Sequence, residues 1–284
     1  MIGRIYNSFK KKEGLKVKKR SLFFSLLLSA GLLPGITAGA AKTSGHDHGH
    51  AHEAKGNYVE SLPKANSFKD LNGKVQIERT TVTKILDEKG DVTGTKTFKK
   101  NTSGGEFSTQ ASTGTQKVSV LAVADAQYRA KYGDWQTRIV QIVEQADVMF
   151  NRDHSIDFVV EAVAPWTSIG GNSSQILSNL RSSFSGGKYK FVVGFTANSK
   201  FDAGGIAYVY SSKPSGSAYS VNLDQGTANT AKAATHEFSH NFGLNHDAQG
   251  SGIRCIMNYD YAYTADVWDS AHNSQISNNK AWYK

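Results

Sequence analysis

Two histidines and a glutamate stand close together in an alanine-rich stretch of this 284-residue chain. His236 and His240 are four residues apart, so on a helix both imidazoles project from one face and can bind the same metal ion. Glu237 lies beside them, where it can take a proton from a metal-bound water. Gly243 can end the helix in a left-handed conformation and let the chain fold back, so that His246 becomes a third ligand. Three neutral nitrogens leave a fourth position open for water, as a catalytic zinc requires.

The pattern is specific enough to disfavour a purely structural interpretation. An H-E-x-x-H sequence alone should arise by chance in roughly a few per cent of chains of this length. The additional Gly243, His246 and Asp247 lower that chance by about a further several thousand-fold. The alternative, a core helix with incidental histidines, is therefore disfavoured.

The same residues resemble a known family. Residues 236–247 (HEFSHNFGLNHD) are similar to the extended zinc motif of the metzincin zinc metalloproteases, and Asp247 resembles the adamalysin/reprolysin branch. Metzincins carry a methionine turn downstream, which residues 255–259 (CIMNY) resemble. That resemblance implies that Met257 lies beneath the three histidines as an apolar floor, whereas Met257 taken alone is ordinary core filler.

An upstream segment extends the resemblance. Residues 204–209 (GGIAYV) are similar to the reprolysin edge strand that lines the substrate cleft and holds an extended peptide by adding it to the sheet. The likeness covers about residues 117–284. It implies an α/β (α+β) metzincin-like fold, in which a mixed twisted sheet is combined with an active-site helix, a methionine turn and a small C-terminal subdomain. The residues implied in peptide binding are Gly205, Ile206, Ala207 and Tyr208.

Three further positions receive expected roles. Cys255 is the only cysteine of the chain, and we interpret it as a buried small hydrophobe rather than a reactive thiol. The lack of any other cysteine excludes latency of the cysteine-switch type. Met257-x-Tyr259 resembles astacins and serralysins, so Tyr259 is either a transition-state stabiliser or a packed aromatic. Asp247 is expected to fix a histidine or the local backbone.

These residues predict a zinc-dependent endopeptidase with one catalytic Zn²⁺ ion and a polypeptide substrate; the sequence leaves calcium open. Zinc lowers the pKa of its bound water towards about 7, Glu237 takes the proton, and the hydroxide attacks a peptide carbonyl. Glu237 then passes the proton to the leaving amine. One alternative is a secreted zinc-binding or adhesive protein with an idle metzincin domain, which the presence of Glu237 disfavours. Another is a metallohydrolase acting on a non-protein amide, which the predicted peptide-binding strand disfavours.

The N-terminus has the layout of a secretory signal peptide. Residues 1–20 contain eight basic residues against one acidic residue, and residues 21–33 are an apolar run. Residues 38–40 (AGA) supply a cleavage site near Ala40, so we expect removal of residues 1–40 and secretion. The apolar run is shorter than the roughly 20 residues that span a bilayer, which disfavours a stable membrane anchor. Because the basic charge is concentrated there, the net charge of +9 gives no support for nucleic-acid binding.

Residues 41–116 are predicted to be a His-rich segment and a propeptide or linker, ahead of a catalytic domain over residues 117–284. We expect this segment to block the cleft until it is cut, with Asp70 or a tract histidine at the zinc; the alternative is a flexible spacer or accessory module. The tract either binds extra metal loosely or is a solvated tether, and its histidines are His46, His48, His50 and His52.

The secondary structure expected from the sequence begins with a hairpin of 75–83 and 95–100 and a linker at 101–116. Strands are expected at 118–124, 156–162, 190–195, 205–210 and 218–223. Helices are expected at 126–150, 173–184, 228–243 and 268–278.

Overall fold

The computed structural model describes residues 57–73, 75, 77, 79–100 and 116–284. The predicted signal peptide, the histidine tract and nearly all of the predicted linker lie outside these ranges. No helix in the described ranges is long and apolar enough to cross a membrane. The strands are β1 (Tyr58–Leu62), β2 (Thr81–Leu86), β3 (Val92–Phe98), β4 (Gln116–Asp125), β5 (Ile156–Trp166), β6 (Phe191–Thr196), β7 (Gly205–Val209) and β8 (Ala218–Leu223).

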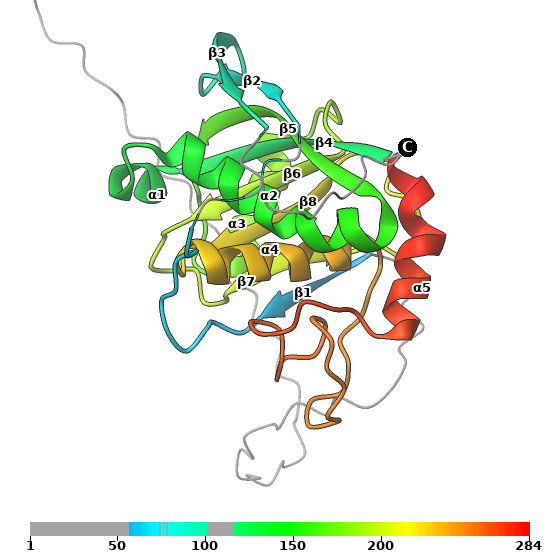
Figure 1. Ribbon diagram of the computed structural model, residues 1–284. Helices are drawn as coiled ribbons and strands as arrows, with labels where there is room; N and C mark the ends of the chain where they lie inside the picture. Colours follow the sequence, from blue (N-terminus) through cyan, green and yellow to red (C-terminus); the bar gives the residue numbers. More distant parts are fainter. Residues whose placement is uncertain (1–56, 74, 76, 78, 101–115) are drawn as a thin grey trace, which may run out of the picture. The chain divides into compact units, whose positions relative to one another are not determined.

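These strands form one eight-stranded mixed sheet in the order β1-β7-β8-β6-β4-β5-β2-β3 (Figure 1). The centre is parallel: β4 pairs with β5 and β6, β6 with β8, and β2 with β5. The outer pairs are antiparallel, namely β7 with β8, β1 with β7, and β3 with β2. The predicted α/β fold with a mixed sheet is confirmed.

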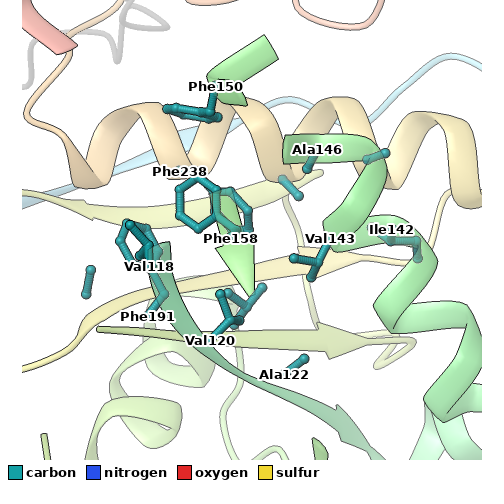
Figure 2. Close-up of a cluster of buried hydrophobic side chains, with 14 of the residues drawn as sticks. Val118, Val120, Ala122, Ile142, Val143, Ala146, Phe150, Phe158, Phe191 and Phe238 are labelled. Atoms are coloured by element: carbon teal, nitrogen blue, oxygen red, sulfur yellow. The ribbon is translucent and has the colours of Figure 1, made fainter. Parts of the chain in front are cut away.

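Helices cover both faces of the central strands. Val118, Val120 and Ala122 of β4 belong to a core with α2 (Trp135–His154) and α4 (Thr227–Asn241), part of which Figure 2 shows. The intervening Leu121 and Val123 pack instead with α3 (Ser173–Ser183). Because side chains alternate along a strand, a strand covered on both faces needs a continuous apolar run. The predicted buried strand at this place is confirmed for that reason.

Aromatic rings hold α4 against the sheet. Phe158 of β5 lies 4.8 Å from Phe238 of α4, 5.1 Å from Phe150 of α2 and 4.9 Å from Phe191 of β6, measured between ring centroids. Figure 2 labels these four rings. All four are fully buried and contribute apolar burial, and the pairs of Phe158 with Phe150 and with Phe191 are edge-to-face. The helix that carries the two histidines is thereby fixed in position relative to the strands.

Two helices occupy the range 126–150, so the prediction of one continuous helix was wrong. The first is α1 (Ala126–Lys131), and α2 begins at Trp135 after a break that includes Gly133. Tyr132 is extended there, with φ −131° and ψ 112°. Its hydroxyl donates to Asp224 Oδ2 at 2.8 Å, and the Arg138 guanidinium lies 4.0 Å from its ring. These tertiary contacts, together with the low helix propensity of glycine, outweigh the helical periodicity.

The C-terminal segment closes the far end of α4. Gly243 has φ +89°, and a Cβ there would lie 2.7 Å from Tyr210 O, so the predicted left-handed glycine is confirmed. Three carbonyls at this end accept side-chain hydrogen bonds from α5 (Ser270–Asn279) and the 3₁₀ turn Lys280–Tyr283, which satisfies groups that a helix end leaves unpaired. The donor–acceptor pairs are Gln275 Nε2 to Gly243 O, Asn279 Nδ2 to Phe242 O, and Tyr283 Oη to Asn241 O.

The segment before the predicted linker supplies three strands of the same sheet. The predicted hairpin exists, but its strands are β2 and β3, which flank the turn more closely than 75–83 and 95–100. The turn is tight because Asp87 Oδ1 accepts from Lys89 N and Asp91 N. β1, which the sequence analysis did not predict, lies at the opposite edge beside β7 (Figure 1).

We expect the aromatic cluster to dominate the stability of the fold. Phe158→Ala should lower the free energy of unfolding by about 3–5 kcal/mol, because it removes a buried ring that touches three others. Val82→Ala is the control: Val82 is 59% exposed, and its change should stay within about 0.5 kcal/mol. Urea unfolding of both variants measures this. Equal losses would show that the cluster does not hold the fold together.

Candidate active site and metal centre

Three imidazoles converge on one point. His236 and His240 come from successive turns of α4, and His246 comes from the loop that follows. Nε2 of His246 lies 3.0 Å from Nε2 of each of the other two, which are 3.1 Å apart. Nitrogens at about 2.0–2.1 Å from a tetrahedral zinc would stand about 3.3–3.4 Å apart. The three atoms therefore need to move by only a few tenths of an ångström to surround a zinc ion.

The outer nitrogens of the two helix histidines are already paired. Nδ1 of His236 lies 2.8 Å from Ile256 O, and Nδ1 of His240 lies 2.7 Å from Leu244 O. Because a carbonyl only accepts, each Nδ1 must carry the proton, and each Nε2 presents a lone pair to the centre of the group. Burial lowers the pKa of His236 to about 4 and that of His240 well below its usual range, so both rings are neutral. The donor set fits a zinc ion.

The methionine turn holds the returning chain against α4. Ile256 O receives the His236 proton, and Met257 O accepts from Asp247 N at 3.1 Å. Asn258 donates to Ser251 Oγ and Ile253 O at 3.1 Å, which orders the loop between His246 and the turn. Met257 is fully buried, and its backbone position beside the third histidine agrees with the expected turn. Its role as the floor beneath the rings stays a prediction.

Glu237 is fully buried beside the histidines. Neither carboxylate oxygen makes a hydrogen bond of normal geometry. Burial is the main cause that raises its pKa well above the usual range; the Glu60 charge adds to this, and the Leu62 backbone N–H opposes it. A Cβ at Gly205 would lie 2.8 Å from Glu237 Cγ, so only glycine lets β7 approach this closely. The carboxyl group therefore lies against β7, the strand predicted to bind substrate.

β1 lies along that predicted strand. It pairs antiparallel with β7, from Tyr58 opposite Val209 to Leu62 opposite Gly205. Gly204 N donates to Leu62 O at 2.7 Å. The Tyr259 hydroxyl donates to Ser61 O at 2.9 Å, and its ring centroid lies 4.3 Å from that of His246. The predicted β7 residues thus hold an extended segment of this same chain.

A carboxylate from β1 stands by the histidines, and the predicted Asp70 does not. Glu60 Oε2 lies 3.5 Å from Nδ1 of His246. Asp70 was expected there, but its Oδ1 accepts from Thr227 N at 2.9 Å and pairs with Arg138 at 3.1 Å. Thr227 begins α4, about 13 Å along the helix axis from His236. Asp70 therefore caps the opposite end of the helix, and the tract histidines lie outside the described residues.

The Asp247 side chain belongs to a second group of possible metal ligands. Its Oδ2 lies 3.8 Å from Nδ1 of His272. Cys255 lies in the same group and is fully buried, with a pKa raised by that burial, as expected of an unreactive thiol. Sequence reasoning missed Glu60, His272 and Asp269 as neighbours of the site. For Asp269 and His272, the sequence pattern that could have indicated them is their D-x-x-H spacing at the start of α5.

Comparison with known families decides the assignment. Residues 114–276 match Reprolysin_5, described as Metallo-peptidase family M12, which is more than half of the chain. The chain belongs to metallo-peptidase family M12. This is a family of metallopeptidases, which implies zinc, and His236, His240 and His246 are a group within the matched range that could hold a metal ion. The resemblance to the reprolysin branch of the metzincins is confirmed.

More distant comparisons add little to the M12 assignment. No curated protein matches significantly. Metalloproteinase-II from Bacteroides fragilis matches at 13% identity and a TM-score of 0.40, over 58% of this chain and 53% of that one. A chain of a chaperone–substrate complex matches at 14% identity and a TM-score of 0.42, over 60% of this chain and 36% of that one. The M12 chain thus spans about half of the first protein and about a third of the second. Neither likeness supports a functional assignment.

Removal of one imidazole should remove one tightly held zinc ion. We expect purified His240→Ala to retain one zinc per chain fewer than the wild type after dialysis against a weak chelator, because two ligands hold zinc far less tightly than three. His154→Ala is the control, since this buried histidine at the end of α2 is outside the group. Elemental analysis gives the count. An unchanged zinc content in folded His240→Ala would contradict the assignment of the site.

Proposed function

We propose that this M12 protein is a secreted zinc-dependent endopeptidase in which Glu237 is the general base. The zinc would be held by His236, His240 and His246. The observation that carries the proposal is the convergence of three imidazole nitrogens beside a buried carboxyl group, at a sheet edge where an extended segment lies. When bound, the zinc ion would polarise the substrate carbonyl and lower the pKa of a water molecule towards about 7.

We infer that Glu237 moves the proton in this reaction. Its two oxygens are buried and make no hydrogen bond of normal geometry with the described residues, so they are available to a water molecule and to a leaving amine. In the proposed reaction an oxygen of Glu237 accepts the proton of the attacking water and delivers it to the nitrogen of the broken peptide bond. The bare Cα of Gly205 leaves room for this carboxyl group.

The contacts of β1 support binding of peptides rather than other amides. Gly204 N and the Tyr259 hydroxyl both donate to backbone carbonyls of the bound strand, at 2.7 and 2.9 Å. A substrate lying on β7 in the same direction would offer the same carbonyls whatever its side chains. Tyr259 therefore supplies a hydrogen-bond donor for a substrate carbonyl, in keeping with a role in stabilising the transition state.

Leu62 suggests which side chains the cleft accepts. It is 1% exposed and packs with Ala233 of α4 and Ala262, and Tyr259 and Tyr263 lie against this cluster. The Leu62 side chain is thus packed among small and aromatic residues, and this position suits a branched aliphatic side chain. We infer that substrates with leucine at the position of Leu62 are preferred.

We further propose that residues 41–116 act as a propeptide and that β1 is its inhibitory part. β1 occupies the strand position that a substrate needs. The chain that follows is also attached: Lys69 N donates to Gln225 O, and Ala228 N donates to Lys69 O, both at 3.0 Å. Because this segment is covalently joined to the domain, it competes with substrate at a high effective concentration.

Glu60 adds an electrostatic element to the inhibition. Its carboxylate lies beside His246, on the strand that fills the cleft, and its charge acts on both Glu237 and Tyr259. In the proposed latent form it brings a second negative charge close to Glu237. A substrate carbonyl has to displace both the strand and this carboxylate before the reaction starts.

Loosening β1 should activate the full chain. Leu62→Ala removes buried apolar contacts worth about 2–5 kcal/mol, so we expect casein cleavage to rise about tenfold or more. Val59→Ala is the matched control, because Val59 lies on the same strand but is 36% exposed. Equal activity of Leu62→Ala and the wild type, in chains that cleave casein in a chelator-sensitive way, would refute the inhibitory role of β1 and leave the peptidase proposal intact.

Loss of the base should abolish cleavage without loss of metal. In the Leu62→Ala chain, we expect Glu237→Gln to lower casein cleavage by about 100-fold to 10,000-fold while zinc content is unchanged. Glu161→Gln, at an exposed position of β5, is the control and should behave like its parent. Normal turnover by Glu237→Gln would rule out this residue as the base. Zinc binding without cleavage by the parent would favour the zinc-binding or adhesive alternative.

The N-terminal sequence supports export of this peptidase. The basic start, the apolar run at residues 21–33 and the small residues up to Ala40 support cleavage of residues 1–40 and secretion. In the exported protein the tract from His46 to His52 would offer a loose extra binding place for metal, separate from the catalytic centre.

A further inference from the structure

Four metal-binding side chains converge outside the three-histidine group. Asp247, Cys255, Asp269 and His272 each offer a ligand atom, and these atoms lie within 4.8 Å of one another. They come from three segments, namely the loop after His246, the methionine turn and the start of α5. Neither the proposed reaction nor the inhibition by β1 uses them in its chemistry.

The spacing is close to that of a tetrahedral zinc site. Nδ1 of His272 lies 2.7 Å from Asp269 Oδ2, 3.3 Å from Cys255 Sγ and 3.8 Å from Asp247 Oδ2. Ligand atoms at the usual zinc distances of about 2.0–2.3 Å would be about 3.3–3.6 Å apart. The three distances from His272 Nδ1 lie on both sides of that range. Small side-chain rotations would therefore place all four ligand atoms around one ion.

Hydrogen bonding does not satisfy the group. Nδ1 of His272 carries at most one proton, yet three possible acceptors face it within 3.8 Å. Asp247 Oδ2 is buried and makes no hydrogen bond of normal geometry with the described residues. Cys255 is fully buried, and the side chains of Asp247 and His272 are 11% and 10% exposed. Asp247 Oδ2 is therefore a buried carboxylate oxygen that lacks a normal hydrogen bond, and a bound cation would satisfy it.

The other bonds of these residues leave the ligand atoms available. Asp269 caps α5 through Oδ1, which accepts from His272 N at 2.9 Å, so Oδ2 remains for an ion. Cys255 Sγ is approached by the backbone N–H groups of Met257 and Asp269, each at 3.4 Å. These N–H groups act against the rise that burial causes in the Cys255 pKa, and they would stabilise the thiolate that binds a metal ion.

We propose that Asp247, Cys255, Asp269 and His272 form a second, structural zinc site. Four protein ligands close the coordination shell, which distinguishes this site from the open three-histidine centre. A thiolate and an imidazole favour zinc over calcium or magnesium, which take oxygen ligands. The bound ion would join the loop after the third histidine to the methionine turn and to α5. It would provide a cross-link in a chain whose one cysteine cannot form an internal disulfide.

Cobalt substitution isolates this site, because Cys255 is the only cysteine of the chain. Full-length protein is stripped of metal and loaded with Co²⁺, and the near-ultraviolet thiolate-to-cobalt charge-transfer band is recorded. We expect the band in the wild type and in Glu237→Gln, and its loss in Cys255→Ser. Neither the histidine tract nor the three-histidine centre contains sulfur, so cobalt bound there gives no such band.

A second variant covers the case in which Cys255→Ser does not fold. His272→Gln keeps the thiol but removes one ligand, so the band should weaken or shift and one fewer cobalt ion per chain should be retained. Reaction of the native thiol with a thiol reagent should be slow in the metal-loaded wild type and faster after chelation. Absence of the band in folded, cobalt-loaded wild type would overturn the proposal. An unchanged band in His272→Gln would overturn the four-ligand site.

Discussion

The organisation of the catalytic region depends on the return of the chain after α4. Nε2 of His246 must come within about 3 Å of the two helix imidazoles, and helix geometry alone cannot place it there. The positive φ of Gly243 starts the return, and the carbonyls of Ile256 and Met257 hold both sides of it. α5 and the final turn then bond the carbonyls at the end of α4, so the C-terminal residues serve the metal centre without touching it.

The close approach of β7 to Glu237 has two consequences. It brings an edge of β7 close to the proposed reacting groups, which would suit peptide substrates, and that edge can also pair with an extended segment of the same chain. β1 takes this position. In the proposed function, substrate binding and inhibition by the propeptide would use one set of backbone contacts and would therefore exclude each other.

The sequence predicted what depends on local spacing. The four-residue separation of His236 and His240, the glycine after the helix and the apolar run of β4 follow from helix and strand periodicity, and the structure has them. It did not predict β1, because YVESL is a short strand with little hydrophobic contrast and its pairing joins residues nearly 150 positions apart. The break at Tyr132 was missed for a similar reason, since contacts with distant residues stabilise it.

The most direct test of the central claim is anomalous diffraction at the zinc absorption edge from crystals of the full chain grown with zinc. The account predicts a peak bounded by the Nε2 atoms of His236, His240 and His246, with β1 lying on β7 beside it. Zinc peaks elsewhere, with no peak among these three nitrogens in an otherwise intact fold, would contradict it.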